Sequence, residues 1–449
     1  MTDAAVFKGR ASVRAGILVT GTEVLTGVIS DQNGPWLSER LRDLGVDVAM
    51  ITVVGDRPED LLGELQHMAD AGVQLIITSG GLGPTADDLT AELVGDFSGR
   101  EMILDEELAE RIFAIMGSLR GRWPNVDEDA LREANRKQAV IPDGSTVLEP
   151  VGTAPGLIVP PAAGSPPARP VVVVLPGPPR ELQPMWAAAV QTEPVRAVLD
   201  RAGEFRRGIL RLYGIPEAEI ANTLRAADAG GLPLADLEIT TCLRRSEIEV
   251  VIRYEPPAEA DYLALVAFIA ARHERELFSR DGATIDEQVV EVLVSSGATV
   301  AVAESCTGGL VSARFTDVPG SSAYFLGGAV AYSNAAKTSL VGVDPRLIEE
   351  HGAVSTEVAR ALAFGARSRF SAQVGIGVTG VAGPGGGTEE KPVGYVCFCV
   401  AYGAVPSGAA ERSLTRSSRL HGGRQDVRER STTVVMHMLA RVLGGDSDS

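Results

Sequence analysis

The sequence has few cysteines and lacks any long hydrophobic run. Its 449 residues include four cysteines, at positions 242, 306, 397 and 399. None belongs to a CxxC pair and no histidine stands at zinc-ligand spacing, which disfavours a structural zinc site. No run approaches the length that spans a membrane, and the first segment, MTDAAVFKGRASVRAG, lacks the apolar core of a signal peptide. These absences predict a cytoplasmic protein that does not associate with membranes.

Basic residues are also scarce relative to acidic ones. The formal net charge is −18 and the pI is about 4.8. A strongly acidic surface repels a phosphate backbone, whereas nucleic-acid binders usually carry basic patches. We therefore expect no nucleic-acid partner, and any phosphorylated substrate must be held by local hydrogen-bond donors.

Aromatic residues make up only 5% of the chain, so the cores must be built from aliphatic side chains. The length predicts two to four domains. Residues 14–200 alternate apolar strands with helical stretches, which is typical of a parallel sheet covered by helices on both faces. Residues 205–280 indicate a small α+β module, and residues 284–445 indicate a second α/β domain. The fold class is therefore α/β, with three domains.

Several elements can be placed within the last two regions. In the middle region we predict a strand over 206–214, a helix over 216–227, a pair of strands over 237–254 and a long helix over 261–278. In the last region we predict strands before Ser305 and over 327–333, 374–380 and 394–401, and a final helix near 426–443.

The densest chemistry of the chain lies in the segment AESCTGG. Ser305 stands where a buried strand gives way to a helix whose first turn contains Gly308 and Gly309. This places a hydroxyl at the carboxyl edge of the sheet, where ligands of α/β proteins bind. The N–H groups at the start of the helix are expected to favour negative charge on an oxygen atom.

A serine nucleophile needs a base, and no Ser-His-Asp arrangement is evident. Lys337 is the better candidate, with Tyr332 just upstream, because burial can lower the pKa of a lysine. The segment GIGVTGVAGPGGGT and the segment GGRQDVRER add groups that can receive an oxyanion or bind a phosphate. These groups are Thr379, Gly383, Gly385, Arg424 and Arg428.

Each of these residues also has a simpler interpretation. Ser305 alone would most often be a helix N-cap. Lys337 alone would most often be a solvated charge, and Tyr332 a core residue. Cys306 is a rival nucleophile, although without a histidine partner a buried, inert thiol is the expectation.

A second site is predicted near the N-terminus, in TSGGLGPTADDLT. Gly80, Gly81 and Gly83 permit close approach of phosphate oxygens to backbone N–H groups. The adjacent carboxylates of Asp87 and Asp88 suit a divalent cation that bridges those phosphates. Strand-end loops with Glu23 and Glu181 are candidates to face the same crevice. The alternative is that Asp87 and Asp88 only cap the next helix.

The motifs of the last region resemble a known family. ESCTGG, PGSSAYFLGG, YSNAAK, GVTGVAGPGGGTEEKPVGYV and GGRQDVR occur in the order found in the C-terminal domain of CinA and in PncC-type nicotinamide mononucleotide (NMN) deamidases. The resemblance implies hydrolysis of NMN to nicotinate mononucleotide and ammonia, without a cofactor. It implies Ser305 as the nucleophile and Lys337 as the base or the activator of the base. It also implies that Ser322, Tyr332 and Thr379 assist proton transfer and oxyanion binding. Arg424 or Arg428 is implied to bind near the phosphate.

The first region resembles the N-terminal domain of CinA, which is similar to MoaB/MogA-like molybdopterin-binding domains. The motifs are GTEVLTG, SGGLGPTADDLT, NRKQAVIP, VGTAPG and LPGPPREL. This implies a metal-dependent ADP-ribose pyrophosphatase, with Asp87 and Asp88 as metal ligands. Thr22 stands where many relatives carry an acidic residue, and Glu149 where asparagine is common.

The middle region resembles the KH-type module of CinA proteins. It contains no GxxG loop flanked by basic residues, so we interpret it as a spacer or dimerisation element. A homodimer is expected from the resemblance and from the frequency of two-fold assemblies.

Three functional hypotheses remain. The first is a two-activity nucleotide hydrolase acting on NMN and ADP-ribose in pyridine-nucleotide salvage. The second is a molybdopterin-type binding protein with an inactive C-terminal domain. The third is a non-enzymatic competence or damage-response factor.

Overall fold

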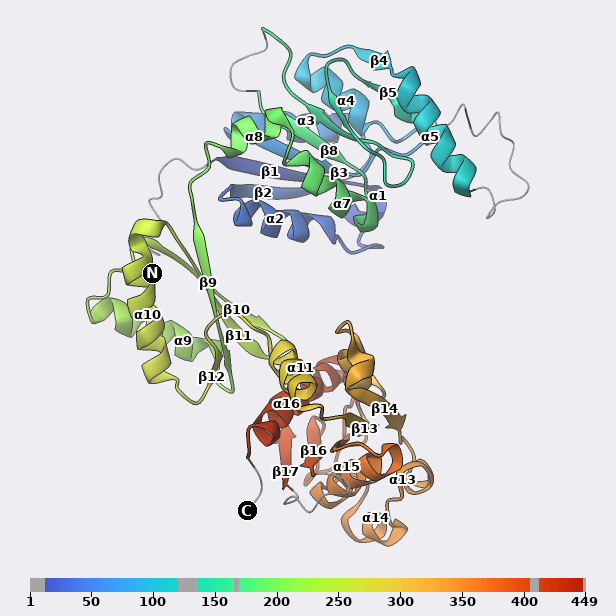
Figure 1. Ribbon diagram of the computed structural model, residues 1–449, viewed down its shortest axis with the longest axis vertical. Coiled ribbons are helices and arrows are strands. Elements are labelled where there is room, and N and C mark those ends of the chain that lie inside the picture. Colours follow the sequence, from blue (N-terminus) through green and yellow to red (C-terminus); the bar gives the residue numbers. More distant parts are fainter. Residues whose placement is uncertain (1–12, 120–131, 133–135, 165–168, 404–411, 447–449) are drawn as a thin grey trace. The chain divides into compact units, whose positions relative to one another are not determined.

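The computed structural model describes residues 13–119, 132, 136–164, 169–403 and 412–446 (Figure 1). Residues 1–12, on which the expectation about a signal peptide rests in part, lie outside the described residues. The chain divides into two compact units. Unit 1 contains Met1–Arg206 and Tyr254–Glu259, and unit 2 contains Arg207–Arg253 and Ala260–Ser449. Unit 2 therefore combines the middle module with the C-terminal domain.

Unit 1 is built on a six-stranded sheet with the order β2-β1-β3-β8-β7-β6. The first four strands in this order are parallel, as predicted, whereas β7 and β6 join antiparallel. The strands are β1 (Arg14–Thr20), β2 (Asp47–Val54), β3 (Leu75–Ser79), β6 (Thr146–Leu148), β7 (Gly156–Val159) and β8 (Val171–Leu175). A separate antiparallel pair joins β4 (Met102–Leu104) to β5 (Val140–Pro142).

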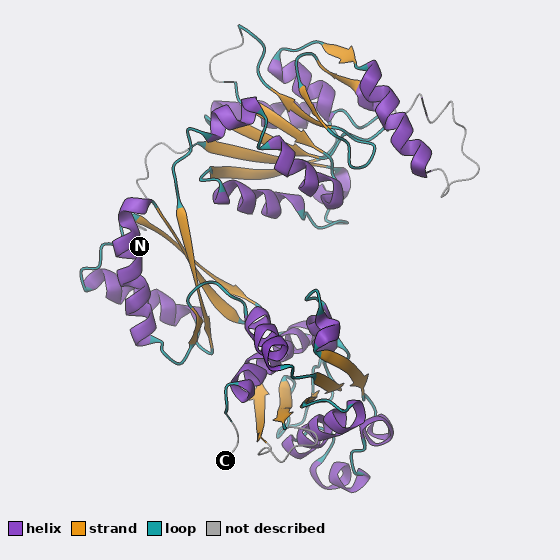
Figure 2. Ribbon diagram, viewed as in Figure 1, coloured by secondary structure: helices purple, strands orange, loops and turns teal. Residues whose placement is uncertain are grey.

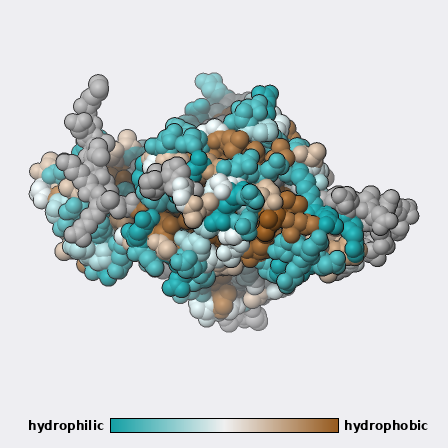
Figure 3. Space-filling view, turned by 90° about the horizontal axis from the view of Figure 1, so that it is seen from above, coloured by the Kyte–Doolittle hydropathy of each residue, from teal (hydrophilic) through white to brown (hydrophobic). Residues whose placement is uncertain are grey.

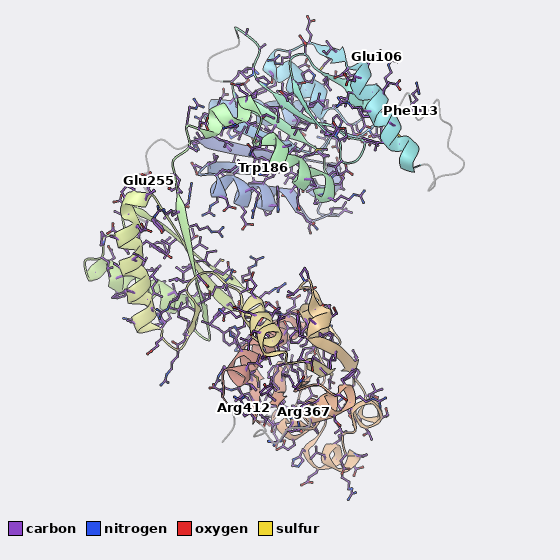
Figure 4. All side chains as sticks on the ribbon, in the orientation of Figure 1. Glu106, Phe113, Trp186, Glu255, Arg367 and Arg412 are labelled. Carbon is purple, nitrogen blue, oxygen red and sulfur yellow. The ribbon has the colours of Figure 1, made fainter. Side chains whose placement is uncertain are left out.

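Helices cover both faces of this sheet (Figure 2). Neighbouring strand residues alternate between two cores, so that Leu18 packs in one and Ile17 in the other. Trp186 lies in the same core as Ile17 (Figure 4). The first core takes α3 (Pro58–Asp70), α4 (Thr90–Ser98) and α5 (Glu106–Leu119), and the second takes α2 (Asn33–Asp43), α7 (Pro179–Ala189) and α8 (Glu193–Leu199).

The middle module contains a four-stranded sheet with the order β10-β11-β9-β12. Its strands are β9 (Arg206–Tyr213), β10 (Leu237–Arg244), β11 (Glu247–Tyr254) and β12 (Leu277–Ser279), and its helices are α9 (Glu217–Ala229) and α10 (Glu259–Arg272). The predicted strands and the first helix are confirmed. The predicted long helix ends earlier, at Arg272, and the chain then forms the short strand β12.

The C-terminal domain has a five-stranded sheet with the order β14-β13-β15-β16-β17. The first three strands are parallel, and β16 and β17 are antiparallel. The strands are β13 (Val300–Glu304), β14 (Phe325–Val330), β15 (Val374–Gly380), β16 (Tyr395–Tyr402) and β17 (Arg412–Arg419). Strand β17 was not predicted, because its sequence RSLTRSSR is mostly polar.

Helices pack on both faces of this second sheet as well. One core contains residues of α11 (Ile285–Ser296), α12 (Leu310–Thr316) and α16 (Arg424–Leu443). The opposite face carries α13 (Asn334–Val341), α14 (Pro345–His351) and α15 (Thr356–Phe370).

Glycines let α15 approach β15 closely. A methyl group added at Gly377 would lie 2.0 Å from the Ala359 carbonyl oxygen, and one at Gly375 would lie 2.0 Å from that of Ala363. Both atoms belong to the backbone of α15, so a side chain at either glycine would force the helix away. Part of the predicted glycine-rich site segment therefore serves helix–sheet packing.

Helix α16 also joins the C-terminal domain to the middle module. Its buried His437 lies 2.7 Å from the Glu247 carboxylate of β11 and stacks on Tyr213 of β9 at a centroid distance of 3.7 Å. Burial, and then the charge of Glu247, raises the pKa of Tyr213. The module thus contacts the last helix of the C-terminal domain through a buried polar pair.

None of the helices in the described part of the chain is both long and apolar enough to span a membrane. The face drawn in Figure 3 is mostly hydrophilic, with separate hydrophobic patches.

Candidate active site

Ser305 lies at the carboxyl end of β13, as the sequence predicts. Its side chain is 8% exposed, and its backbone N–H donates to the Val378 carbonyl of the neighbouring strand at 2.9 Å. Residues 305–309, which we call the nucleophile turn, carry the chain from β13 into α12. Gly308 and Gly309 adopt φ values of 59° and 100°, a left-handed conformation that side chains disfavour. The two glycines therefore make this tight turn feasible.

The N–H groups at the start of α12 are occupied by a residue that the sequence analysis missed. The Glu304 side chain is fully buried, and its carboxylate accepts hydrogen bonds from the N–H groups of Gly309, Val311 and Ser312 at 2.9–3.1 Å. It also accepts a bond from the Ser312 hydroxyl at 2.7 Å. The expectation that these N–H groups are available for substrate charge is therefore wrong for these three donors.

Lys337 is buried against the nucleophile turn. It lies on α13, its residue exposure is 2%, and its Nζ lies 3.3 Å from the Ser305 Oγ. Nζ also donates to the Tyr332 carbonyl at 3.0 Å. Burial lowers the pKa of Lys337 from its ordinary value, against a smaller opposing effect of Cys306. A lowered pKa raises the neutral fraction of the amine, and only a neutral amine can accept the serine proton.

The two candidate arginines have different partners. Arg424 is exposed, and it donates to the Gly383 carbonyl at 2.8 Å and to the Tyr332 hydroxyl at 3.3 Å. Arg428 is less exposed and donates to the carbonyls of Cys306 and Thr307 at 3.2 and 2.9 Å. Arg424 thus lies at the rim of the site, whereas Arg428 holds the nucleophile turn.

The remaining predicted groups differ in exposure and in hydrogen bonding. Tyr332 is 58% exposed, so the interpretation as a core residue does not hold. The buried Thr379 hydroxyl donates to the Ala353 carbonyl at 2.7 Å, so its proton is engaged away from Ser305. Gly383 is buried and Gly385 is exposed in the loop after β15.

The structure does not bring Ser322 to this site. It precedes β14, which runs parallel to β13 with Val300 opposite Phe325 and Glu304 opposite Val330. Ser322 therefore lies at the amino end of these strands and Ser305 at their carboxyl end. A strand of this length separates them by roughly 15 Å, because each residue rises about 3.3 Å.

The structure distinguishes between the simpler interpretations of Ser305 and Cys306. The N-cap of α12 is Gly309, so Ser305 does not cap that helix. Cys306 is buried, and burial raises the pKa of its thiol to about 12. Since the thiolate is the reactive form, Cys306 is poorly suited to be the nucleophile.

The predicted N-terminal site is a pocket of about 640 Å³ at the carboxyl edge of the first sheet. Gly80, Gly81 and Gly83 line it, and six carboxylates surround it: Glu23, Asp31, Asp56, Asp87, Asp88 and Glu181. Among the described residues that line it, none is lysine, arginine or histidine. Lys137 lies beside the pocket, where its amine donates to the Thr85 carbonyl, but the six carboxylates still favour an anionic ligand that enters with a cation.

The Asp87 and Asp88 carboxylates share one partner. The Thr85 hydroxyl lies 2.5 Å from an oxygen of each and has one proton to share between them. Its hydrogen bond to Asp87 is the main cause of the lowered pKa of that carboxyl. Neither caps α4, whose N-cap is Leu89. Within the described ranges, no group of three or more His, Cys, Asp or Glu side chains is arranged to hold a metal ion. Magnesium is often held by one or two carboxylates with substrate phosphates and water, so the pair fits such an ion only together with a phosphate ligand.

Thr22 and Glu149, the two positions at which this chain differs from many relatives, have different surroundings. Thr22 donates through its N–H and its hydroxyl to the Asp56 carboxylate at 3.0 and 2.7 Å, so an acidic group lies beside this position. Glu149 pairs with Arg111 at 3.0 Å and does not line the pocket.

Two buried amides in the pocket were also missed. Asn33 donates to the Gly177 carbonyl, and Gln138 donates to the Leu82 carbonyl. Because a carbonyl only accepts, these bonds fix which end of each amide is the nitrogen. Their side-chain oxygens have no hydrogen-bond partner among the described residues. Asn33 begins α2 and Gln138 lies in a three-residue 3-10 helix, and a single amide at such a position gives no periodic signal in the sequence.

Both halves of the chain resemble known protein families. Residues 282–443 match the family model described as CinA C-terminal domain, and residues 16–195 match the probable molybdopterin binding domain. A CinA-like protein of Mycobacterium sp. (strain MCS) is 57% identical over 432 residues, covering 96% of this chain and 99% of its own. The chain belongs to the CinA family. A CinA-like protein of Mycobacterium tuberculosis (strain ATCC 25177 / H37Ra) is 54% identical over 438 residues, covering 97% of this CinA-family chain and 98% of its own.

A solved structure is also similar to part of this CinA-family chain. The competence/damage inducible protein CihA from Agrobacterium tumefaciens is 36% identical, with a TM-score of 0.32. The similarity covers 36% of this chain and 95% of that protein.

The burial of Cys306 predicts selective thiol alkylation. Partial burial, and then the charge of Glu249, raises the pKa of Cys242 as well, so exposure is the difference between the thiols. In the folded protein at about pH 9, iodoacetamide should modify the exposed Cys242 and spare Cys306, Cys397 and Cys399, which are buried. Peptide mass spectrometry before and after denaturation measures this difference. Preferential labelling of Cys306 in the folded protein would restore it as the rival nucleophile.

Proposed function

We propose that the C-terminal domain is an amidohydrolase that converts NMN and water to nicotinate mononucleotide and ammonia. The observation that supports the proposal most is the buried Lys337 amine, 3.3 Å from the Ser305 hydroxyl. The match to the CinA C-terminal domain and the motifs shared with NMN deamidases support the choice of substrate. The coarser assignment, membership of the CinA family, does not depend on this proposal.

The proposed reaction proceeds through an acyl-enzyme. Lys337 takes the proton of Ser305 as the serine oxygen attacks the carboxamide carbon. Lys337 then returns this proton to the leaving nitrogen, so the carbon–nitrogen bond breaks and ammonia departs. Water, deprotonated by the same amine, attacks the ester carbon and releases nicotinate mononucleotide and the serine hydroxyl.

The surrounding groups have supporting roles in this proposal. Arg424 would bind the substrate phosphate, since its guanidinium lies at the exposed rim beside the Gly383 loop. The Tyr332 carbonyl orients the Lys337 amine, and the exposed Tyr332 hydroxyl is available to substrate beside Arg424. Thr379 would support the site by fixing the segment at Ala353 rather than by meeting the oxyanion directly.

Removal of either member of the pair should abolish the reaction. Ser305→Ala lacks the attacking oxygen, and Lys337→Arg keeps a charge that cannot accept a proton. We expect ammonia release from NMN to fall by about 10⁴-fold or more in each. Coupled ammonia detection measures this, and Ser295→Ala, an exposed serine on α11, serves as the control. Turnover by folded Ser305→Ala protein at the wild-type rate would exclude the acyl-enzyme.

We propose a second activity for unit 1, the cleavage of ADP-ribose to AMP and ribose 5-phosphate. The acidic pocket without a lining cation favours a pyrophosphate that enters with a divalent ion. Asp87 and Asp88 would hold that ion, which when bound neutralises negative charge developing on the pyrophosphate. The residues themselves would position the phosphates against the glycine turn at Gly80 and Gly81.

Asp88→Ala tests this second activity separately from the first. We expect ADP-ribose cleavage with added divalent metal to fall by about 100-fold, because a carboxylate ligand of the ion is lost. Ammonia release from NMN should stay unchanged. Asp96→Ala, an exposed aspartate on α4, is the matched control. Binding of ADP-ribose without cleavage by the wild type would instead indicate a binding domain of the molybdopterin type.

A further inference from the structure

Two charged side chains hold the nucleophile turn: Glu304, which directly precedes it in the sequence, and Arg428 on α16. We propose that Glu304 and Arg428 are positioning residues, which together fix residues 305–309 so that the Ser305 oxygen stays against Lys337. This inference rests on the proposed deamidase function. It separates the roles of the two arginines, because Arg428 contacts the turn whereas Arg424 contacts Gly383 and Tyr332 at the rim, where we propose that the phosphate binds.

Glu304 holds the helix side of the turn. Each of its two oxygens accepts two hydrogen bonds, one oxygen from the N–H groups of Gly309 and Val311 and the other from the N–H and hydroxyl of Ser312. All four partners are donors, and the carboxylate has no exposed surface. Glutamine has the same shape, but its NH₂ group would face donors in either orientation of the amide.

Arg428 holds the carbonyl side of the same turn. Its Nε donates to the Cys306 oxygen and its Nη2 to the Thr307 oxygen, across more than 120 residues of sequence. In a trans peptide the C=O and the N–H point in opposite directions. By fixing the Cys306 carbonyl, Arg428 therefore directs the Thr307 N–H to the other side of the turn, away from α16.

The N–H groups directed in this way can stabilise negative charge. Burial raises the pKa of Cys306, and the N–H groups of Cys306 and Thr307 oppose that effect. The N–H of the residue after a nucleophile commonly contributes to an oxyanion hole. Glu304 does not accept from these two N–H groups, since its bonds go to Gly309, Val311 and Ser312. These two N–H groups therefore lie beside the Cys306 sulfur, next to Ser305, and Glu304 does not occupy them.

A comparison of two substrates tests this assignment. Glu304→Gln and Arg428→Lys are assayed for ammonia release from NMN and from nicotinamide riboside, which carries the same amide without the phosphate. We expect kcat to fall about 100-fold on both substrates, because a misplaced nucleophile affects the chemical step, and KM to change less than about twofold. Arg441→Gln removes an exposed arginine of α16 that pairs with Asp446 beyond the end of the helix, and it should keep wild-type kinetics.

A second measurement follows Ser305 without NMN. A fluorophosphonate probe should label Ser305 in the wild type and about 100-fold more slowly in both variants, while circular dichroism shows the native fold. If Glu304→Gln does not fold, Arg428→Lys carries the test, since its side chain is partly exposed and retains its charge. Both readouts are compared with thermal unfolding, which distinguishes a mispositioned turn from a loss of fold.

The outcomes separate this inference from the proposed function. Folded variants with unchanged kcat and unchanged labelling would overturn the positioning role. A rise in KM for NMN alone in Arg428→Lys would overturn it as well, because Arg428 would then be a phosphate ligand. A wild-type protein that reacts with the probe but releases no ammonia from NMN would contradict the deamidase proposal, while the labelling rates would still decide the roles of Glu304 and Arg428.

Discussion

The contact between the Lys337 amine and the Ser305 hydroxyl depends on removing a cationic side chain from water. A lysine whose residue exposure is 2% loses most of the hydration that stabilises its charged form, and the resulting decrease in pKa raises the fraction of neutral amine, the form that can accept a proton. The Tyr332 carbonyl is its only other partner shown among the described residues. An opposing carboxylate would restore the charge, and the nearby carboxylate, Glu304, is instead engaged by four donors of the turn and α12.

The sheet and α16 supply the rigidity that this contact requires. Strand β13 lies between β14 and β15, so Ser305 emerges from the interior of the sheet, and α13 brings Lys337 back after β14. Helix α16 contacts both the nucleophile turn and the middle module. Near its start Arg428 binds the turn, and farther along His437 is buried against the middle module. The middle module and the nucleophile turn thus both contact one helix, and they belong to one compact unit.

Much of the fold was predictable from periodicity, and the site only in part. The apolar runs before Ser305 and over 374–380 predicted central strands, and Ser305 and Lys337 were chosen correctly as neighbours. The edge strand β17 was missed because polar residues tolerate a position that pairs on one side only. Glu304 was missed because a carboxylate at the end of a buried strand signals nothing until its four donors are brought around it. Ser322 was assigned by motif alone, and the parallel register of β14 places it at the other edge of the sheet.

The most direct measurement is the titration of Lys337 itself. The chain has four lysines, at positions 8, 137, 337 and 391, so a protein labelled at lysine with ¹³C and ¹⁵N gives a spectrum simple enough to assign with Lys337→Arg. We predict that the Lys337 side-chain resonance titrates with a pKa below the ordinary value of 10.5, which follows from its burial. A pKa at or above that value would contradict the account, because the amine would then stay charged and could not deprotonate Ser305.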